Sequence, residues 1–150
     1  MSEENVELAK QGIAAIQEAY AKDDIEPWRQ QVETFFDPDV LLESGVAGGA
    51  FTEGEWRGLD GAVGFVANQM EVLEQMWIRL EEFIHVDEDR FITGISFGGR
   101  ARHTAIPVEL HPFHLLTLRD RKILRWQIFL TREDALEAAG LSGDNENQSH

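Results

Sequence analysis

The sequence of 150 residues contains no cysteine, which excludes disulfide bonds, thiol nucleophiles and thiolate metal sites together. Basic residues are also scarce: 13 lysines and arginines stand against 28 acidic residues, giving a formal net charge of −15. Nucleic acids and anionic membranes attract proteins through basic patches, so we expect neither as a partner. The sequence has no apolar run of membrane-spanning length and no start typical of a signal peptide. We therefore expect a cytoplasmic protein.

A chain of this length is expected to form one domain with a sizeable core. We assign residues 2–142 to that domain and the uniformly polar residues 143–150 to a disordered tail. Apolar residues recur every three or four positions over 3–21 and 59–75, and this spacing predicts two helices. A shorter helix is expected over 24–36, because the Asp-Pro-Asp that follows disfavours helical backbone.

Alternating apolar residues predict strands over 77–87 and 90–100, joined by a two-residue turn at Glu88-Asp89. On the first of these strands Ile78, Leu80, Ile84 and Val86 are expected to share one face. Residues 40–43 and 55–57 are expected to form two short strands, with a glycine-rich loop over 44–54 between them.

Residues 111–131 predict a last hairpin in which the apolar side chains have even numbers on both strands. This parity calls for a three-residue loop, Arg119-Asp120-Arg121, which would place His114 opposite Trp126. Arg121 would then adopt left-handed backbone, so Arg121→Gly is expected to raise the melting temperature.

His114 is the one ionisable side chain on the apolar face of this hairpin. Such a histidine is either a hydrogen-bonded core residue or an acid/base group on the floor of a pocket. In a pocket, burial would lower the pKa of His114 and make the ring a neutral base at pH 7, whereas a neighbouring Glu43 carboxylate would raise that pKa. The other members of the face are Leu116, Leu118, Leu124, Trp126, Ile128 and Leu130.

The order of these elements resembles the nuclear transport factor 2-like superfamily, in its SnoaL-like branch, over residues 2–142. The matching stretches are SEENVELAKQGIAAIQEAYAKDD, FFDPDV, EWRG, FHLLTLRDRKILR and TREDALEAAGL. The resemblance implies an α+β fold, a cone-shaped barrel in which a curved, mostly antiparallel sheet wraps around N-terminal helices. It also implies a pocket at the wide end and a homodimer through the outer sheet face. The superfamily includes isomerases, cyclases, hydrolases, dehydratases and non-catalytic proteins, so the fold alone gives no function.

The resemblance also implies positions for site residues. The carboxylic acid on the late strand of ketosteroid isomerases falls on His114, and their general base falls on Glu43 or Ser44. Their oxyanion-stabilising tyrosine falls near Ile16, and the carboxylate of limonene epoxide hydrolases falls on Ile128; neither residue can perform that chemistry. We take His114 and Glu43 as the candidate catalytic pair. The expected pocket lining is Ile16, Tyr20, Trp28, Trp56, Met70, Leu116, Trp126 and Ile128.

The sequence thus predicts a pocket for a small hydrophobic, ring-containing molecule, used without a metal or organic cofactor. Proton transfer next to a carbonyl would isomerise, cyclise or dehydrate that molecule. The alternative is a non-catalytic binding protein, or a dimeric scaffold with a filled core. Phe113, Leu115 and Phe129 lie on the otherwise polar face of the last hairpin, where a partner subunit would cover them unless they are ordinary surface residues.

Overall fold

The computed structural model describes residues 2–44 and 54–141, so most of the expected loop 44–54 and the tail 143–150 lie outside the described residues. The helices are α1 (Ser2–Lys22), α2 (Glu26–Phe35), α3 (Gly58–Val72) and α4 (Arg132–Ala138). The strands are β1 (Phe36–Ser44), β2 (Gly54–Arg57), β3 (Leu73–Asp87), β4 (Arg90–Ala101), β5 (Pro107–Leu110), β6 (Phe113–Arg119) and β7 (Lys122–Phe129). No helix in the described ranges is long and apolar enough to cross a bilayer.

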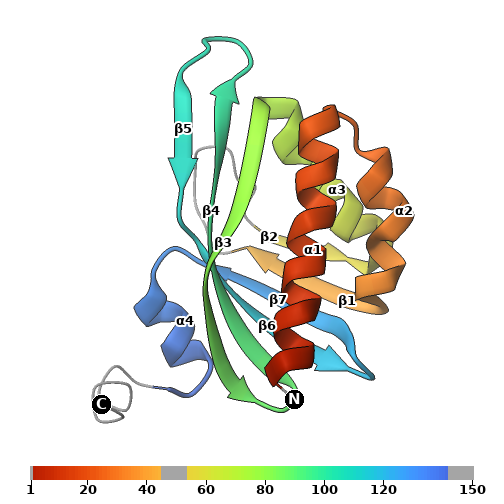
Figure 1. The fold of residues 1–150 in the computed structure, drawn as a ribbon, viewed down its shortest axis with the longest axis vertical. Helices are drawn as coiled ribbons and strands as arrows, with labels where there is room; N and C mark the ends of the chain where they lie inside the picture. The colour runs from red at the N-terminus through yellow and green to blue at the C-terminus, as the bar shows by residue number, and fades with distance from the viewer. Residues whose placement is uncertain (1, 45–53, 142–150) are drawn as a thin grey trace.

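The described strands form one curved sheet in the order β2-β1-β7-β6-β4-β3, and β5 pairs with β4. All pairings are antiparallel except that of β1 with β7. The helices α1, α2 and α3 lie on one side of the sheet and α4 lies on the other (Figure 1). The predicted α+β architecture, a mostly antiparallel sheet wrapped around N-terminal helices, is confirmed.

The helix α3 ends at Val72, three residues earlier than predicted, because Leu73 already has extended backbone and begins β3. Arg102, from the connection between β4 and β5, satisfies the end of this helix. Its backbone N–H donates to the carbonyl of Val72 at 3.0 Å, and its Nε donates to the carbonyl of Met70 at 2.8 Å. A cap supplied from thirty residues away leaves no local signal in the sequence.

The turn between β3 and β4 has the two predicted residues, since Asp87 pairs with Arg90. The register nevertheless shifts between Leu80 and Glu82, which inserts one extra residue into β3. After this bulge Phe83 packs in the main core, while Ile84 and Val86 pack on the other side of the sheet. The prediction that Ile78, Leu80, Ile84 and Val86 share one face is therefore wrong.

The turn between β6 and β7 contains two residues, so the predicted three-residue loop is wrong. Arg119 pairs with Lys122, and the φ angles of Asp120 and Arg121 are 52° and 66°. Two successive positive φ angles are typical of the type I′ turns that suit hairpin twist. The expected left-handed backbone at Arg121 is confirmed, in a different turn from the one predicted.

A bulge at Leu124 restores the even parity that the sequence indicated. Leu118 pairs with Ile123, whereas Thr117 pairs with Arg125, so Leu124 is the extra residue. Ile123 is consequently buried in the core, while Leu124 is only half-buried. The backbone partner of His114 is Ile128, and Trp126 pairs with Leu116, so the prediction that Trp126 lies opposite His114 is wrong by two residues.

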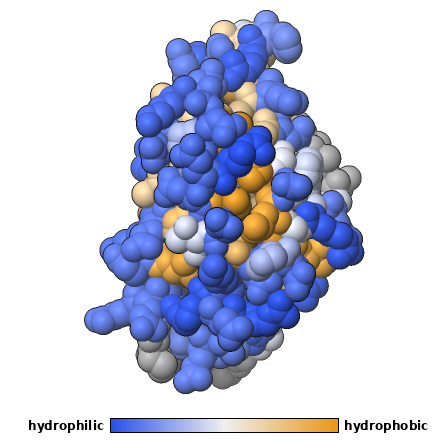
Figure 2. All heavy atoms as spheres, turned by 90° about the vertical axis from the view of Figure 1, so that its right-hand side faces the viewer, coloured by the Kyte–Doolittle hydropathy of each residue, from blue (hydrophilic) through white to orange (hydrophobic). Residues whose placement is uncertain are grey.

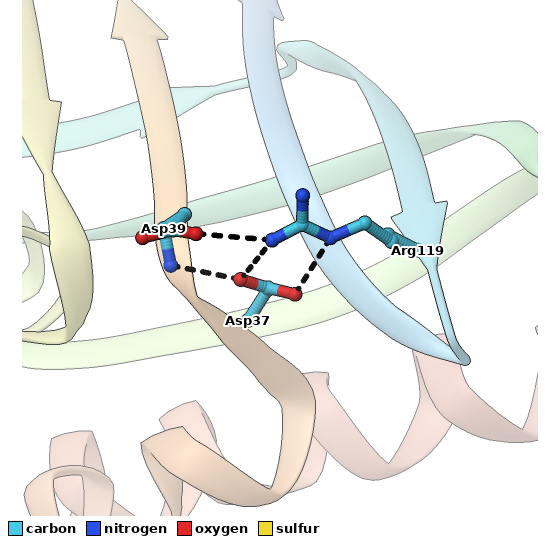
Figure 3. Close-up of polar contacts among 3 residues, drawn as sticks. All are labelled: Asp37, Asp39 and Arg119. Carbon is cyan, nitrogen blue, oxygen red and sulfur yellow. Dashed lines mark hydrogen bonds and ion pairs between the residues drawn. The ribbon is translucent and has the colours of Figure 1, made fainter.

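An ionic contact fastens the start of β1 to the end of β6 across β7 (Figure 3). Arg119 donates from Nε and Nη2 to both carboxylate oxygens of Asp37, at 3.1 and 2.9 Å, and from Nη2 to Asp39 at 3.1 Å. The Arg119 hydrogen bond holds the pKa of Asp37 below its usual value. The contact spans an irregular stretch of β1, whose register with β7 shifts between Phe36 and Leu41. The strand β1 begins four residues before the predicted strand, because Phe36 already pairs with Ile123 of β7.

The short helix α4 covers a second, smaller core on the outer side of the sheet. Leu115 is buried there, with Phe113 and Phe129 packed around it. Thr131 caps α4 as predicted, accepting from the backbone N–H of Asp134 at 3.1 Å, and Gly140 (φ 83°) follows its end. The apolar residues expected to be covered by a partner or left on the surface are thus covered by the chain itself. Assembly into a homodimer stays a prediction.

Candidate functional site

A cavity of about 70 Å³ lies between α1, α2, α3 and the inner face of the sheet. It is about half the size of the roughly 150 Å³ apolar cavity that accommodates benzene in other proteins. Its described lining is apolar apart from four uncharged polar side chains, those of Tyr20, Gln69, Thr93 and His114. Aromatic rings form much of the wall: Trp28, Phe35, Phe36, Phe65, Phe91, Phe97 and Trp126.

The cavity extends toward the helical side of the molecule. Leu8, Gly12 and Ile13 of α1 belong to its wall and are only partly buried. Figure 2 shows the side that lies to the right in Figure 1, where apolar side chains gather in the middle of an otherwise hydrophilic face. A contiguous exposed apolar patch is typical of the entrance to a ligand-binding site.

Six of the eight side chains expected around the pocket line this cavity: Ile16, Tyr20, Trp28, Leu116, Trp126 and Ile128. The other two, Trp56 and Met70, are not among the described residues that line it. Trp56 lies against α3 at two glycines: a methyl group added to Gly61 would come within 2.8 Å of Trp56, and one added to Gly64 within 3.2 Å. Its ring contacts the ring of Phe65, which lines the cavity, so Trp56 packs behind Phe65. Met70 is buried in the main core without reaching the cavity.

Glu43 points away from the cavity, because odd-numbered side chains of β1 at this point face outward. Its Oε1 accepts from Nε of Arg125 at 2.7 Å, and 30% of its side chain is exposed. The structure therefore does not bring Glu43 to His114 as an acid–base pair. Ser44 is the buried residue of the two, and its Oγ has no hydrogen-bond partner in the described structure.

His114 reaches the cavity from β6, and a neighbouring side chain fixes which of its two ring nitrogens carries the proton. Nε1 of Trp126 donates a hydrogen bond of 3.0 Å to Nδ1 of His114. Because an indole N–H only donates, Nδ1 must be unprotonated and the neutral ring must carry its proton on Nε2. Only 8% of the residue is exposed, and burial lowers the pKa of His114 from 6.5 to about 3. At neutral pH the ring presents an N–H donor, and its hydrogen bonds to described residues leave Nε2 unused.

Tyr20 and Gln69 form a second polar contact in the cavity wall. The hydroxyl of Tyr20 donates to Oε1 of Gln69 at 3.2 Å, and each residue is 5% exposed. Burial raises the pKa of Tyr20, so its hydroxyl stays protonated in neutral solution. Gln69 was missed from the sequence, although a glutamine among the apolar positions Ala62, Phe65 and Val66 of α3 was a usable signal.

No protein-family profile matches the chain, and no curated protein matches it either. Solved structures do match. A protein from Catenulispora acidiphila with a ketosteroid isomerase-like fold, in complex with trimethylamine, has a TM-score of 0.62 at 17% identity, over 89% of this chain and 95% of that one. An NTF2-like protein from Anabaena variabilis has a TM-score of 0.68 at 15% identity, over 87% and 91%. A putative SnoaL-like polyketide cyclase from Jannaschia has a TM-score of 0.60 at 16% identity, over 87% and 91%.

The chain has the nuclear transport factor 2-like fold. The resemblance seen in the sequence is thereby confirmed for the architecture.

In this nuclear transport factor 2-like fold the cavity between the sheet and α3 offers hydrogen-bond donors within apolar walls. Nε2–H of His114 is oriented by a bond from the neighbouring strand, and the amide of Gln69 is oriented by Tyr20. No group of His, Asp or Glu side chains within 2–44 and 54–141 is arranged to hold a metal ion. Proton abstraction by His114 would need the lone pair of Nδ1, which the indole of Trp126 already occupies. The arrangement suits donation to an oxygen better than removal of a proton.

Proposed function

We propose that this protein binds a small, uncharged, mostly apolar molecule whose oxygen accepts a hydrogen bond from Nε2–H of His114. A carbonyl oxygen is the simplest such group. The observation that carries the proposal is the bond from Trp126 to Nδ1, because it makes His114 a donor toward the cavity.

The polarity of the cavity supports an uncharged ligand. Its described lining is apolar or neutral, so a charged group would lose its hydration without gaining a counter-charge. The protein from Catenulispora acidiphila is in complex with trimethylamine. In the present cavity a cation beside His114 would be repelled by the positive end of its N–H bond. This bond favours a ligand atom that accepts a hydrogen bond.

The size of the cavity supports a short-chain molecule. The enclosed volume of about 70 Å³ is about half of the roughly 150 Å³ that holds benzene in other proteins, so any ligand as large as benzene must also occupy the open side of the cavity. The partly buried wall formed by Leu8, Gly12 and Ile13 allows a chain to extend toward the surface. We therefore propose a short ketone-like ligand in place of the ring-containing compound expected from the sequence.

Binding of 2-pentanone, followed by NMR titration, tests this proposal. His114→Gln keeps an oxygen to accept from Trp126 and an N–H to donate, so it should retain most of the affinity. The double variant His114→Phe/Trp126→Phe removes the donor without leaving an unpaired indole, and should bind roughly three- to tenfold more weakly, the worth of one hydrogen bond. Trp126→Phe alone controls for the lost ring volume. Equal affinity of the double variant and Trp126→Phe, or no binding to the native protein, would refute the proposal.

Catalysis by proton transfer is the second candidate, and Tyr20 is the observation that favours it. Its hydroxyl stays protonated and lines the same cavity as His114. If the hydroxyl turned from Oε1 of Gln69, to which it now donates, both groups could donate to a developing oxyanion. The Jannaschia protein is named as a putative SnoaL-like polyketide cyclase. Isomerisation, cyclisation and dehydration next to a carbonyl share a first step, loss of a proton from the adjacent carbon. The described lining offers no free side-chain base, so this proton would pass to a water molecule that enters with the ligand. Deuterium exchange at that carbon of 2-pentanone should be accelerated, and Tyr20→Phe should abolish the acceleration; exchange at the solvent rate leaves binding alone.

A further inference from the structure

Gln69 is a buried amide that uses only part of its hydrogen-bonding capacity. Its Oε1 accepts from Tyr20, while its Nε2 makes no hydrogen bond with the described residues. The residue is 5% exposed and lines the cavity. The amide nitrogen is not among the sealed, unpartnered buried atoms of the described residues, so it keeps access to the cavity and can donate to a molecule that enters there.

The position of Gln69 is fixed by its surroundings. The bond from Tyr20 on α1 orients the oxygen of the amide, and thereby its nitrogen. The helix α3 is tied to α2 by the bond from Nε1 of Trp28 to the carbonyl of Ala62, 3.2 Å long, and its last turn is capped by Arg102. Gln69 therefore stands on a rigid element, as a residue that recognises a ligand should.

Aromatic rings separate Gln69 from His114. The ring centroids of His114 and Trp126 are 5.5 Å apart, and those of Trp126 and Phe65 are 5.6 Å apart. Phe65 and Gln69 are four residues apart on α3, so they lie on the same face of the helix. The cavity thus has one donor in the sheet and one in α3, with an apolar wall of two rings between them.

We infer that Gln69 is a second anchor in this cavity and that the ligand is an uncharged molecule with two hydrogen-bond acceptors separated by an apolar segment. This inference rests on the proposed function and specifies its ligand class. Nε2–H of His114 donates to one acceptor and the amide nitrogen of Gln69 donates to the other. A small diketone or keto ester has this pattern, whereas a dicarboxylate would meet only neutral side chains in the described lining.

The experiment compares 2,5-hexanedione with 2-hexanone, which has the same carbon chain and one acceptor fewer. The native protein should bind the dione roughly three- to tenfold more tightly, the worth of one added hydrogen bond. Gln69→Met keeps the length of the side chain without its amide and should abolish the preference, so that the variant binds the dione no more tightly than 2-hexanone. Gln11→Met, which changes an exposed glutamine of α1, is the matched control and should keep the preference.

A second readout needs no substitution: the side-chain amide NMR signals of Gln69 should shift on addition of the dione and stay in place with 2-hexanone. If 2-hexanone binds and the dione binds no more tightly, the inference is wrong and the proposed function stands. If neither binds, the proposed function fails together with it. A preference that survives in Gln69→Met would also overturn the second anchor.

Discussion

His114 should make the stability of this protein depend on pH in a window set by its two protonation equilibria. The unfolded chain has the usual histidine pKa of 6.5, whereas burial lowers the pKa in the folded protein to about 3. Above pH 6.5 the ring is neutral in both states and costs nothing. Below it the unfolded chain takes up a proton that the folded protein refuses, so the free energy of unfolding falls as the pH falls, until the folded pKa is reached.

The magnitude follows from the size of this separation. Within the window the loss is about 1.4 kcal/mol per pH unit. Between pH 7.5 and 5.0 only the last 1.5 units lie below the unfolded pKa, which gives a loss of about 2 kcal/mol from His114. The result at pH 5.0 depends little on the folded pKa as long as that value lies well below 5.

Urea unfolding of the native protein and of His114→Gln at pH 7.5, 6.0 and 5.0 measures this term. Glutamine keeps an acceptor for Trp126 and does not titrate. Both proteins share the carboxylates whose pKa values are lowered, Asp37, Glu81 and Asp87, so acid effects on these groups cancel in the difference. The stability difference between the two proteins should shift by about 2 kcal/mol toward the variant from pH 7.5 to 5.0. A difference that stays constant over this range would show that the folded ring takes up protons normally, and would refute the buried neutral donor.

Three further predictions concern stability and can be checked by thermal or urea unfolding. Arg121→Gly should relieve left-handed backbone strain worth about 1 kcal/mol. It should nevertheless lower the melting temperature, because Nη1 of Arg121 donates to the side-chain oxygen of the fully buried Asn5 at 2.9 Å and the variant loses this bond. A higher melting temperature would mean that the strain outweighs the hydrogen bond. Gly12→Ala should stabilise α1 by roughly 0.5–1 kcal/mol, because the added methyl group meets nothing within 4 Å. Gly98→Ala should strongly destabilise the protein, because its methyl group would clash with the carbonyl oxygen of Val108 in β5. Similar effects of the two substitutions would contradict this packing. Thr131→Ala should cost about 1 kcal/mol by removing the cap of α4, and no loss would mean that the cap contributes nothing.

Hydrophobic periodicity predicted the helices and strands of this fold well, because each element buries one face. It also predicted that His114 shares a buried face with Leu116 and Trp126. Periodicity failed where one residue was inserted into a strand. The bulge at Leu124 keeps the parity of the face while it shortens the turn, so the same apolar pattern fits two different registers. The bulge before Glu82 reverses the face of a strand in its middle, and nothing in the local composition marks it.

The candidate site was predictable in part, through a resemblance that indicated the late strand and the first helix. The side chains that were misplaced depend on contacts between distant elements. Trp56 packs against α3 because Gly61 leaves room for its backbone and Gly64 for its ring. Glu43 is turned outward by the register of β1 on β7 and is held by Arg125. The role of Gln69 depends on Tyr20, forty-nine positions earlier in the chain.

The bond between Trp126 and His114 also has a consequence for how related sequences diverge. Whether the late strand offers the cavity a donor or an acceptor is decided by the residue at position 126, on another strand. A relative that lost the indole N–H would release Nδ1 and let the imidazole change its tautomer while every residue of β6 stayed the same. A substitution at position 126 alone would therefore change what position 114 offers to a ligand, and the chemistry of such a cavity depends on the two positions as a pair.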